Sequence, residues 1–450
     1  MKYVIGLGKT GISLSRYLLR HNISFIAWDD VSGLQEKAQL MGCSVVAPNK
    51  APWHLIEELI LSPGIPINAP APHAAVKLAK QYRVPFRGDI DFWHQTLQHL
   101  SCKFIGITGT NGKSTTHAII DHIFRSAEVP CFSGGNSGVP VFDANILLPQ
   151  SIVNLEMSSY QLDTLDKTRF DAGVLLNITP DHLDRYGNIE NYILSKQSQI
   201  ERVKQAGLKV IGIDGVYSQQ VYKALLDAGH TDLIPISTVQ TLSKGVYTRG
   251  DVIYSSESGI EISLGNIPNI LPGAHNAQNI MASMLVCRFF GVEPVTFFKY
   301  LPLYQGLEHR QEQVLDTAKA LFVNDSKATN AEATRSALEA YSHIYWIAGG
   351  VAKEEGIAPL RTILGNIDKV LLIGQSAERF KNELQDIADK VIIVDTIANA
   401  LRVIDADLKE LNHKITVLLS PACASQDQFQ NFEHRGRIFK EQVHQKFGVI

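Results

Sequence analysis

Short apolar runs alternate along the chain with stretches whose apolar residues recur at helical spacing. Runs of this kind, bounded by glycine, proline or polar turns, are typical of buried β-strands. Strands are predicted at residues 2–5, 25–28, 59–61, 104–107, 151–155, 172–178, 320–323, 344–348, 370–373, 391–394 and 416–419. Helices are predicted at residues 12–20, 116–124, 189–203 and 277–290. Because strands that alternate with helices form parallel sheets, the pattern predicts the α/β class.

One segment departs from this alternation, and the length of the chain implies several domains. Residues 245–254 predict a β-hairpin, and a second short one is predicted near residues 260–264. At 450 residues the chain is too long for a single hydrophobic core. We predict three domains: a Rossmann-like domain at 1–98, a central P-loop NTPase-like parallel sheet with a small added β-sheet at 99–303, and a C-terminal Rossmann-like α/β domain at 304–450.

Composition excludes several classes of partner. Hydrophobic residues make up 45% of the chain and charged residues 19%, which is ordinary for a globular enzyme. The net charge of −3 gives no electrostatic case for binding nucleic acid or an anionic membrane. No apolar run has the length of a membrane span, and the first residues predict a strand rather than a signal peptide. The scattered cysteines predict core thiols in a reducing cytoplasm, not disulfides or structural zinc: Cys43, Cys102, Cys131, Cys287 and Cys423.

The clearest chemical motif is GITGTNGKST at residues 106–115, which lies between a predicted strand and a predicted helix. Gly109 and Gly112 can adopt positive φ and let backbone N–H groups face an anion, and the helix N-terminus adds positive potential there. Lys113 can reach the outer phosphates of a nucleotide, and the Ser114 hydroxyl can ligate Mg²⁺. The alternative is a plain surface turn before a helix, but the combination of residues favours a phosphate-binding loop.

A second glycine-rich turn, G-x-G-x-x-G at residues 6–11, follows the first predicted strand. The next strand ends at Asp29 and Asp30, where an acid could meet a ribose hydroxyl. Taken alone this pattern suggests NAD or FAD, although the same turn can receive the phosphates of any nucleotide or serve only tight packing. The turn at residues 62–66 ends a strand at the same predicted sheet edge, so it either lines the pocket or is an ordinary turn.

Polar residues follow several other predicted strands. Glu156 follows a strand downstream of the phosphate loop, which makes it a candidate Mg²⁺ ligand. His182 is either a metal ligand or a structural histidine. Lys196 lies on a predicted helix, where the pattern alone indicates a solvated surface charge. Hydroxyl-rich turns at residues 324–330 and 420–425 suggest a further ligand edge.

The chain resembles the Mur ligases over essentially its whole length. The resemblance rests on ordered motifs: GTNGKST at 109–115, GGN at 134–136, EMSSYQL at 156–162, DHLDR at 181–185, PGAHN at 272–276, HR at 309–310, NDSKATN at 324–330 and LSPACAS at 419–425. The loop signature also occurs in folylpolyglutamate synthases. The strict phosphate-loop pattern has a glycine where this chain has Ile107, and the resemblance accounts for the difference because the loop of this family carries an extra residue there. The run at 324–330 resembles the branch that adds D-glutamate.

This resemblance implies an ATP-dependent amide ligase of cytoplasmic peptidoglycan synthesis. The γ-phosphate of ATP would pass to the L-alanyl carboxylate of UDP-N-acetylmuramoyl-L-alanine, giving an acyl phosphate and ADP. The amine of D-glutamate would then attack, and the tetrahedral intermediate would expel phosphate. The third domain would close over ATP, two Mg²⁺ sites are expected, and the enzyme is expected to act as a monomer without nucleic acid or membrane insertion.

The resemblance also assigns roles to individual residues. Those expected in catalysis are Lys113, His182, Lys196 and Arg310. Those expected to bind ATP are Gly109, Thr110, Asn111, Gly112, Lys113, Ser114, Thr115, Asn279, Arg310 and Asp325. Those expected to bind the UDP-substrate are Lys9, Thr10, Asp29, Gly64, Asn136 and His182, with Asp30 as an alternative to Asp29. Those expected to bind D-glutamate are Lys327, Thr329, Lys353, Ser425 and Phe432. The expected Mg²⁺ ligands are Ser114, Glu156, His182 and Lys196 as a carbamate (N6-carboxylysine).

Three alternatives stay open at this point. Another ligase of the same superfamily, such as a folylpolyglutamate synthase, would show the same loop, although a complete first α/β domain argues against it. A nucleotide-binding sensor would bind ATP without amino-acid-dependent turnover. A dehydrogenase with a fused phosphate-loop domain would require a nicotinamide cofactor.

Overall fold

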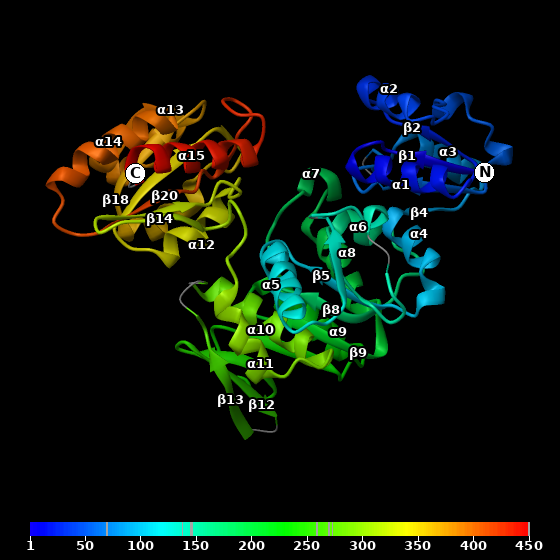
Figure 1. Ribbon diagram of the computed structural model, residues 1–450, viewed down its shortest axis with the longest axis horizontal. Coiled ribbons are helices and arrows are strands. Elements are labelled where there is room, and N and C mark those ends of the chain that lie inside the picture. The colour runs from blue at the N-terminus through cyan, green and yellow to red at the C-terminus, as the bar shows by residue number, and fades with distance from the viewer. Residues whose placement is uncertain are drawn as a thin grey trace. The chain divides into compact units, whose positions relative to one another are not determined.

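The computed structural model describes residues 1–68, 71–136, 138–144, 147–257, 260–268, 271 and 273–448; Pro272 of the PGAHN motif lies outside these ranges. The chain forms two compact units (Figure 1). The larger unit holds Met1–Pro268 and Asn276–Tyr304, and the smaller holds Asn269–His275 and Gln305–Ile450. The boundary predicted at residues 98/99 lies inside the larger unit, and the one predicted at 303/304 lies one residue from its end.

The N-terminal part of the larger unit is a four-stranded parallel sheet of order β2-β1-β3-β4. Its strands are β1 (Lys2–Ile5), β2 (Phe25–Trp28), β3 (Glu58–Leu61) and β4 (Phe86–Gly88). Its helices are α1 (Lys9–Arg20), α2 (Ser32–Leu40), α3 (Ala74–Tyr82) and α4 (Asp89–Thr96). The predicted strand, glycine turn and helix at the N-terminus are confirmed, with the helix beginning at Lys9 rather than Ile12.

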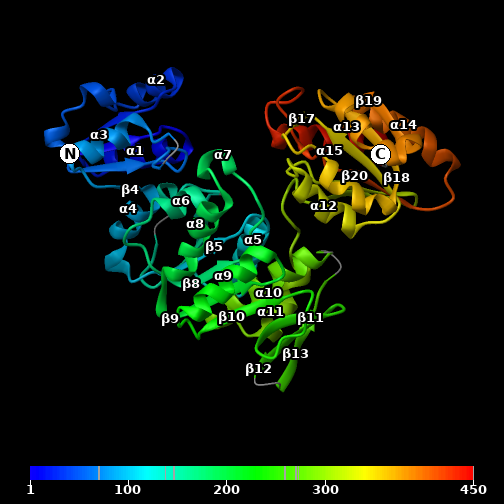
Figure 2. The ribbon, with the colours of Figure 1, turned by 180° about the vertical axis from the view of Figure 1, so that it is seen from behind.

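The central sheet joins nine strands among the described residues, in the order β13-β12-β11-β10-β9-β8-β5-β7-β6. The strands are β5 (Lys103–Thr108), β6 (Cys131–Gly135), β7 (Ile152–Glu156), β8 (Phe170–Leu175), β9 (Val203–Gly212), β10 (Leu233–Ser237), β11 (Gly245–Arg249), β12 (Val252–Glu257) and β13 (Ile260–Asn266). Pairing is parallel from β6 to β11 and antiparallel from β11 to β13. The predicted small added sheet is therefore an antiparallel extension of the central one (Figure 2).

The helices of the central part are α5 (Lys113–Ser126), α6 (Ser159–Asp163), α7 (Leu183–Tyr186), α8 (Ile189–Glu201), α9 (Val216–Asp227), α10 (Ala274–Phe289) and α11 (Pro294–Tyr300). One hydrophobic core runs from the N-terminal sheet into the central sheet, including Val4, Leu14, Trp93, Phe104 and Leu155. Because burying apolar surface is the main driving force for packing, this shared core explains why two sheets form one unit.

The smaller unit contains a sheet of order β14-β15-β20-β16-β18-β19. Its strands are β14 (Glu312–Asp316), β15 (Ala320–Asn324), β16 (Ile344–Gly349), β18 (Ile367–Ile373), β19 (Val391–Asp395) and β20 (Ile415–Leu419). All pairs are parallel except β14–β15 at the edge. A separate antiparallel pair is formed by β17 (Val351–Ala352) and β21 (Cys423–Ala424). The strands predicted in this region and their parallel arrangement are confirmed.

Helices cover both faces of this sheet. They are α12 (Ala331–Ala340), α13 (Ala377–Glu383), α14 (Ile397–Glu410) and α15 (Phe432–Phe447). Apolar residues of α12 and α13 belong to one core cluster, and those of α14 and α15 belong to another. The unit is thus a three-layer α/β domain. Within the described ranges, no helix combines the length and the apolar character that crossing a membrane requires.

The glycines of the first turn have distinct structural roles. Gly6 has φ +91°, a conformation that glycine adopts without steric penalty. A Cβ on Gly11 would lie 1.8 Å from the carbonyl oxygen of Gly6, so helix α1 packs against the turn only because Gly11 lacks a side chain. A Cβ on Gly8 would meet no atom within 4 Å, which leaves space in front of the turn.

We therefore expect Gly11→Ala to destabilise the protein by about 1–3 kcal/mol or more, because the methyl group overlaps the turn backbone. Gly8→Ala, three residues earlier in the same motif, is the matched control, and its free energy of unfolding should stay within about 0.5 kcal/mol of the parent. Urea unfolding followed by circular dichroism measures both. Equal effects of the two substitutions would contradict the steric role of Gly11.

Candidate active site

The predicted phosphate loop connects β5 to α5 at the carboxyl edge of the central sheet. Gly109 and Gly112 have φ values of +155° and +85°, so both positions use the conformational freedom that the sequence predicts. Gly112 precedes α5 without a side-chain cap on the helix N-terminus. Lys113 folds back over the loop, and its Nζ donates to the carbonyls of Gly109 at 2.8 Å and Thr110 at 2.7 Å. This arrangement places an ammonium group beside backbone amides at a helix N-terminus.

The segment that follows β8 supports the loop from behind. Asn177 accepts from the amide of Thr110 through its carbonyl and from the amide of Asn111 through Oδ1, each at 2.9 Å. The Oγ1 of Thr110 accepts from the amide of Thr179 at 3.0 Å. These bonds fix the loop conformation without using Lys113 or Ser114. Asn177 was not among the predicted site residues, since a single asparagine after a strand carries no distinctive signal.

Asn279, predicted on the ATP side, is buried in α10 and 1% exposed. Its Oδ1 accepts from Thr116 Oγ1 at 3.2 Å. A Cβ on Gly112 would lie 2.3 Å from the same Oδ1, so the glycine is required for α10 to approach the loop. Asn279 is therefore placed directly beside the start of α5.

Lys196 is the most unusual residue of the site. It lies in α8 and is 1% exposed, which contradicts the surface position that the helical pattern alone indicates. Its Nζ donates to the carbonyl of Gly109 at 2.8 Å and lies 4.8 Å from the centre of the Tyr192 ring. Burial lowers the pKa of the Lys196 ammonium well below its usual range, and the neighbouring charge of Lys113 lowers it further. The buried environment therefore shifts Lys196 toward the neutral amine, although the nearby acids Asp181, Asp163 and Glu156 oppose the shift.

Glu156 ends β7, and the register of β5 and β7 pairs it with Ile107, just before the loop. Its side chain is buried, with 2% of the residue exposed. Asn136 donates through Nδ2 to Glu156 Oε1 at 2.8 Å, and the Asn136 amide donates to the Glu156 carbonyl at 2.9 Å. Two residues predicted for different roles, metal ligation and binding of the sugar end, are thus in direct contact.

His182 precedes the short helix α7 in a left-handed conformation, with φ +54°. Its Nε2 lies 3.6 Å from a carboxylate oxygen of Asp181, and 45% of its side chain is exposed. The ring of Tyr192 lies 6.2 Å from the imidazole of His182, centre to centre. Because Tyr192 also lies beside Lys196 Nζ, this one aromatic ring is next to two of the four predicted catalytic residues.

A pocket of about 510 Å³ opens between the first glycine turn and the central part of the larger unit. It is lined by five of the six residues predicted to bind the UDP-substrate: Lys9, Thr10, Asp29, Gly64 and Asn136. The sixth, His182, is not among the lining residues. Lys9 Nζ donates to the Gly138 carbonyl at 2.8 Å, which ties the N-terminal turn to the central part.

The two acids at the end of β2 have different surroundings. Asp29 lines the pocket, and its carboxylate accepts from the amides of Leu7 at 2.6 Å and Val31 at 2.9 Å. Asp30 instead accepts from Trp28 Nε1 at 2.9 Å and lies 3.1 Å from His73 Nε2. The geometry therefore favours Asp29 as the acid that faces a ligand.

In the smaller unit, the loops that carry Lys327, Thr329 and Ser425 follow the adjacent parallel strands β15 and β20. Lys327 Nζ lies 5.1 Å from the centre of the Phe432 ring. Ser425 is 2% exposed, and among the described residues its Oγ has no hydrogen-bond partner. Thr329 lies two residues beyond Lys327 in the same loop. Lys353 follows β17 and Ser425 follows β21. Because these two strands are antiparallel, the two residues lie at opposite ends of the pair, and Lys353 is exposed.

Asp325 follows β15 and is 6% exposed. Its carboxylate accepts from Ser420 Oγ at 2.7 Å and from the amide of Gln311 at 3.2 Å. Burial raises the pKa of Asp325 to about 7, although the hydrogen bond from Ser420 opposes this shift. Arg310 directly precedes Gln311, so two residues predicted to bind ATP, Arg310 and Asp325, belong to one local arrangement within the smaller unit.

Comparisons with known proteins agree with this geometry. The family model "Mur ligase middle domain" matches residues 107–287, and "Mur ligase MurD-like, N-terminal domain" matches residues 1–82. The UDP-N-acetylmuramoylalanine–D-glutamate ligase of Caulobacter vibrioides is 38% identical over 446 residues, covering 98% of this chain and 94% of that protein. The chain belongs to the Mur ligase family.

Other relatives of this Mur ligase carry the same name. The protein so named from Brucella abortus is 39% identical and covers 99% of this chain and 96% of its own length. Among solved structures, UDP-N-acetylmuramate-alanine ligase MurC from Thermotoga maritima has a TM-score of 0.60 at 16% identity, with 99% of each chain covered. MurF from Acinetobacter baumannii has a TM-score of 0.61 at 18% identity, with 92% of this chain covered. These structural likenesses show that the chain has the α/β fold of the Mur ligases.

Arg435 of this Mur ligase was not predicted, yet it connects the two loops of the smaller unit. It is fully buried in α15, and its guanidinium donates to the carbonyls of Ser326 at 2.8 Å and Cys423 at 3.0 Å. Its Nε donates to Ser326 Oγ at 2.9 Å. Burial lowers the pKa of Arg435 to about 10, so the residue still carries its charge at neutral pH. An arginine within a polar helix gives no sign of burial in the sequence.

We expect Arg435→Ala to destabilise the protein by roughly 3–5 kcal/mol, because it leaves carbonyls of both loops buried without donors. Arg435→Lys should give an intermediate loss, since an ammonium lacks the planar fork that reaches both loops. Urea unfolding measures these changes, with Arg437→Ala, an exposed arginine of the same helix, as the control. If the lysine variant were as stable as the parent, the two-loop contact would not matter.

Proposed function

We propose that this Mur ligase joins D-glutamate to UDP-N-acetylmuramoyl-L-alanine at the expense of ATP. The observation that carries the proposal is the full-length similarity to relatives bearing that name, at 38–39% identity. The pocket beside the first glycine turn supports it, because five residues expected at a UDP-sugar line one cavity. The phosphate loop supports the ATP-dependent step.

In the proposed first step, a carboxylate oxygen of the substrate attacks the γ-phosphorus of ATP, and the bond to the β,γ-bridging oxygen breaks to release ADP. Both reactants are anions, so the site must supply positive charge where they meet. Lys113 and the loop amides are proposed to hold the phosphates, and Arg310 is proposed to approach the γ-phosphate. Asn279 is proposed to contact the adenine side and Asp325 the ribose.

The residues around the loop fit Mg²⁺, the metal that the family implies. The Ser114 hydroxyl and the buried Glu156 carboxylate are oxygen ligands, which Mg²⁺ prefers. Asn136 holds one Glu156 oxygen and orients the carboxylate. We propose that Ser114 and Glu156 hold a first ion, and that His182 and a Lys196 carbamate hold a second. Bound Mg²⁺ would neutralise charge that develops on the phosphate oxygens.

Lys196 is proposed to act as a carbamate. Its neutral amine can attack the carbon of CO₂, forming an N–C bond and releasing one proton to solvent. The product is an anionic, oxygen-bearing group at a position where the unmodified lysine donates to the Gly109 carbonyl. The buried environment favours the neutral amine that this reaction requires.

D-Glutamate is proposed to bind in the smaller unit. It carries two carboxylates, which suit the Lys327 ammonium and the hydroxyls of Thr329 and Ser425. The buried Ser425 Oγ supports this proposal, because buried hydroxyls normally have a hydrogen-bond partner and a bound carboxylate would supply one. Phe432 would form an apolar wall beside Lys327. Lys353 stays a weaker candidate because it is exposed.

The proposal is tested by phosphate release from ATP with UDP-N-acetylmuramoyl-L-alanine and D-glutamate, L-glutamate or no amino acid, in Mg²⁺ and bicarbonate. Release only with D-glutamate is expected. Release with L-glutamate at an equal rate would contradict the assigned amino acid. No release with any of them would overturn the acceptor assignment and lead to tests with folate-type acceptors.

The carbamate is tested with Lys196→Ala, which we expect to lower the rate by roughly 100-fold or more, because a metal-binding anion is lost. Short carboxylic acids such as formate should restore part of the rate by supplying the missing carboxylate. Nucleotide binding and thermal unfolding of the variant verify that it folds. Unchanged activity, or a folded variant that no carboxylic acid rescues, would argue against a carbamate.

A further inference from the structure

Three polar side chains gather at the edge of the C-terminal sheet where its strands begin. His343 directly precedes β16, Asp368 is the second residue of β18, and His413 lies two residues before β20. Strands β20, β16 and β18 are adjacent and parallel, and Ile344 of β16 pairs with both Ile367 of β18 and Thr416 of β20. The register of the sheet therefore brings together residues that are far apart in sequence. None of them was singled out by the sequence motifs.

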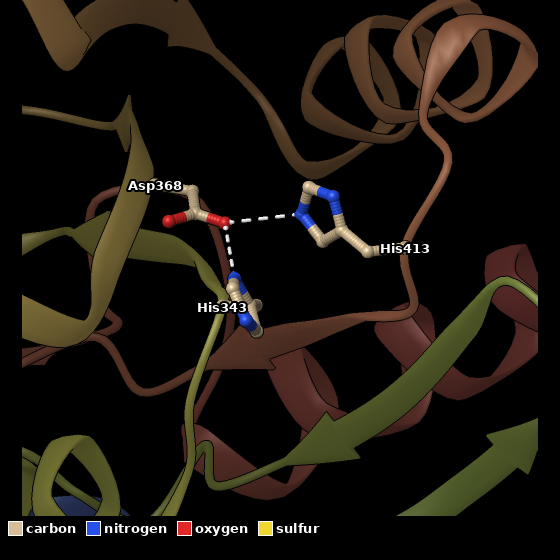
Figure 3. Close-up of side chains that lie close together, drawn as sticks. All are labelled: His343, Asp368 and His413. Atoms are coloured by element: carbon tan, nitrogen blue, oxygen red, sulfur yellow. Dashed lines mark hydrogen bonds and ion pairs between the residues drawn. The ribbon is translucent and has the colours of Figure 1, made fainter.

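Figure 3 shows the two imidazoles directed at the same carboxylate. His343 Nδ1 lies 3.1 Å and His413 Nε2 lies 3.5 Å from one oxygen of Asp368. The candidate ligand atoms of the three residues all lie within 4.8 Å of one another, and in the described parts of the chain no other group of three such residues meets this criterion. Zinc ligands at about 2.0–2.2 Å in a tetrahedron lie roughly 3.4 Å apart. The two histidine–aspartate distances, 3.1 and 3.5 Å, are close to that value, and the two imidazole nitrogens lie within 4.8 Å of each other.

The three side chains also leave room for further ligands. Their exposed fractions are 55% for His343, 36% for Asp368 and 47% for His413, so solvent reaches the cluster. The lysines next to the ligands in sequence form ion pairs of their own: Lys369 with Asp407 and Lys414 with Asp316. The nearby cations are thus paired with other acids, and the carboxylate of Asp368 faces the two histidines.

We propose that His343, Asp368 and His413 form a binding site for a divalent first-row transition metal, with Zn²⁺ as the best-suited ion. Two imidazole nitrogens and one carboxylate oxygen match the ligands of Zn²⁺, with water completing the tetrahedron. Mg²⁺ prefers oxygen ligands and retains its water, so the cluster discriminates against the metal of the phosphate loop. The bound ion would link the starts of three neighbouring strands.

The site is separate from the predicted D-glutamate loops of the same unit. Those loops leave the carboxyl ends of β15 and β20, whereas the three ligands lie at the amino ends of their strands. The five residues of β20 span about 17 Å at roughly 3.3 Å per residue. An ion at His413 therefore cannot contact a substrate beyond Leu419, and the proposal does not depend on the proposed reaction.

The test is calorimetric titration of Zn²⁺ into the full-length chain without a histidine tag, in excess Mg²⁺ to occupy oxygen-rich sites. The parent should bind one Zn²⁺ per chain at this site, and the isotherms of His343→Ala and His413→Ala should lack that binding event. Removing the hydrogen-bond partner of a metal ligand weakens metal binding by roughly 10- to 100-fold. Removing a ligand itself should therefore weaken Zn²⁺ binding by at least that factor. His444→Ala, an exposed histidine of α15, is the matched control and should bind as the parent does.

Thermal unfolding provides a second readout. Zn²⁺ should raise the unfolding temperature of the parent and of His444→Ala but not of His343→Ala, because only a folded sheet brings the ligands together. The exposed ligands make these variants tolerable to the fold, which their unfolding temperatures without metal verify. If the parent binds no Zn²⁺, or if His343→Ala and His413→Ala retain the parent isotherm, the proposal is overturned.

Discussion

The buried contact between Lys196 and the Gly109 carbonyl depends on how closely helix α8 approaches the central sheet. A Cβ on Gly106 of β5 would lie 2.2 Å from Gln199 Nε2, one turn beyond Lys196 in the helix. Because Gly106 has no side chain, the buried amide of Gln199 packs directly against β5. A larger residue there would have to displace that amide, which lies on the same helix as Lys196. The single glycine of this strand thus serves helix packing, whereas the glycines of the loop that follows are those predicted to bind phosphate.

The same packing explains the electrostatics of the site. An ammonium buried beside Lys113 loses hydration and meets a like charge, so its neutral form is favoured. A solvated lysine is almost entirely protonated near pH 7, so little of it is present as the amine that reacts with CO₂. The depth of α8 on the sheet therefore determines both the position and the chemistry of Lys196. The proposed carbamate rests on this packing and not on any single hydrogen bond.

Much of the fold is predictable from the sequence because apolar runs and glycine turns are local signals. The strands beside Gly109 and Asp29 lie where the pattern predicts them, and parallel pairing places the carboxyl end of each beside that of its neighbour, β7 for β5 and β1 for β2. Lys196 and Arg435 are different, because their burial is decided by helices and loops distant in sequence. A buried charged residue on a helix has the same sequence pattern as an exposed one, so only the resemblance to a family could single out Lys196, and nothing singled out Arg435.

The two edges of the C-terminal sheet are suited to different functions. At the carboxyl edge, Arg435 holds the loops after β15 and β20 together, so that Lys327 and Ser425 keep fixed positions. At the amino edge, His343 and His413 lie in short connections whose spacing follows directly from the strand register. A metal bound there would fix the spacing of β20, β16 and β18. It would not touch the carboxyl-edge loops, because the length of the strands lies between them. Its effect would therefore be on the stability of the sheet, and any influence on the reaction would have to pass through the positions of the strands themselves.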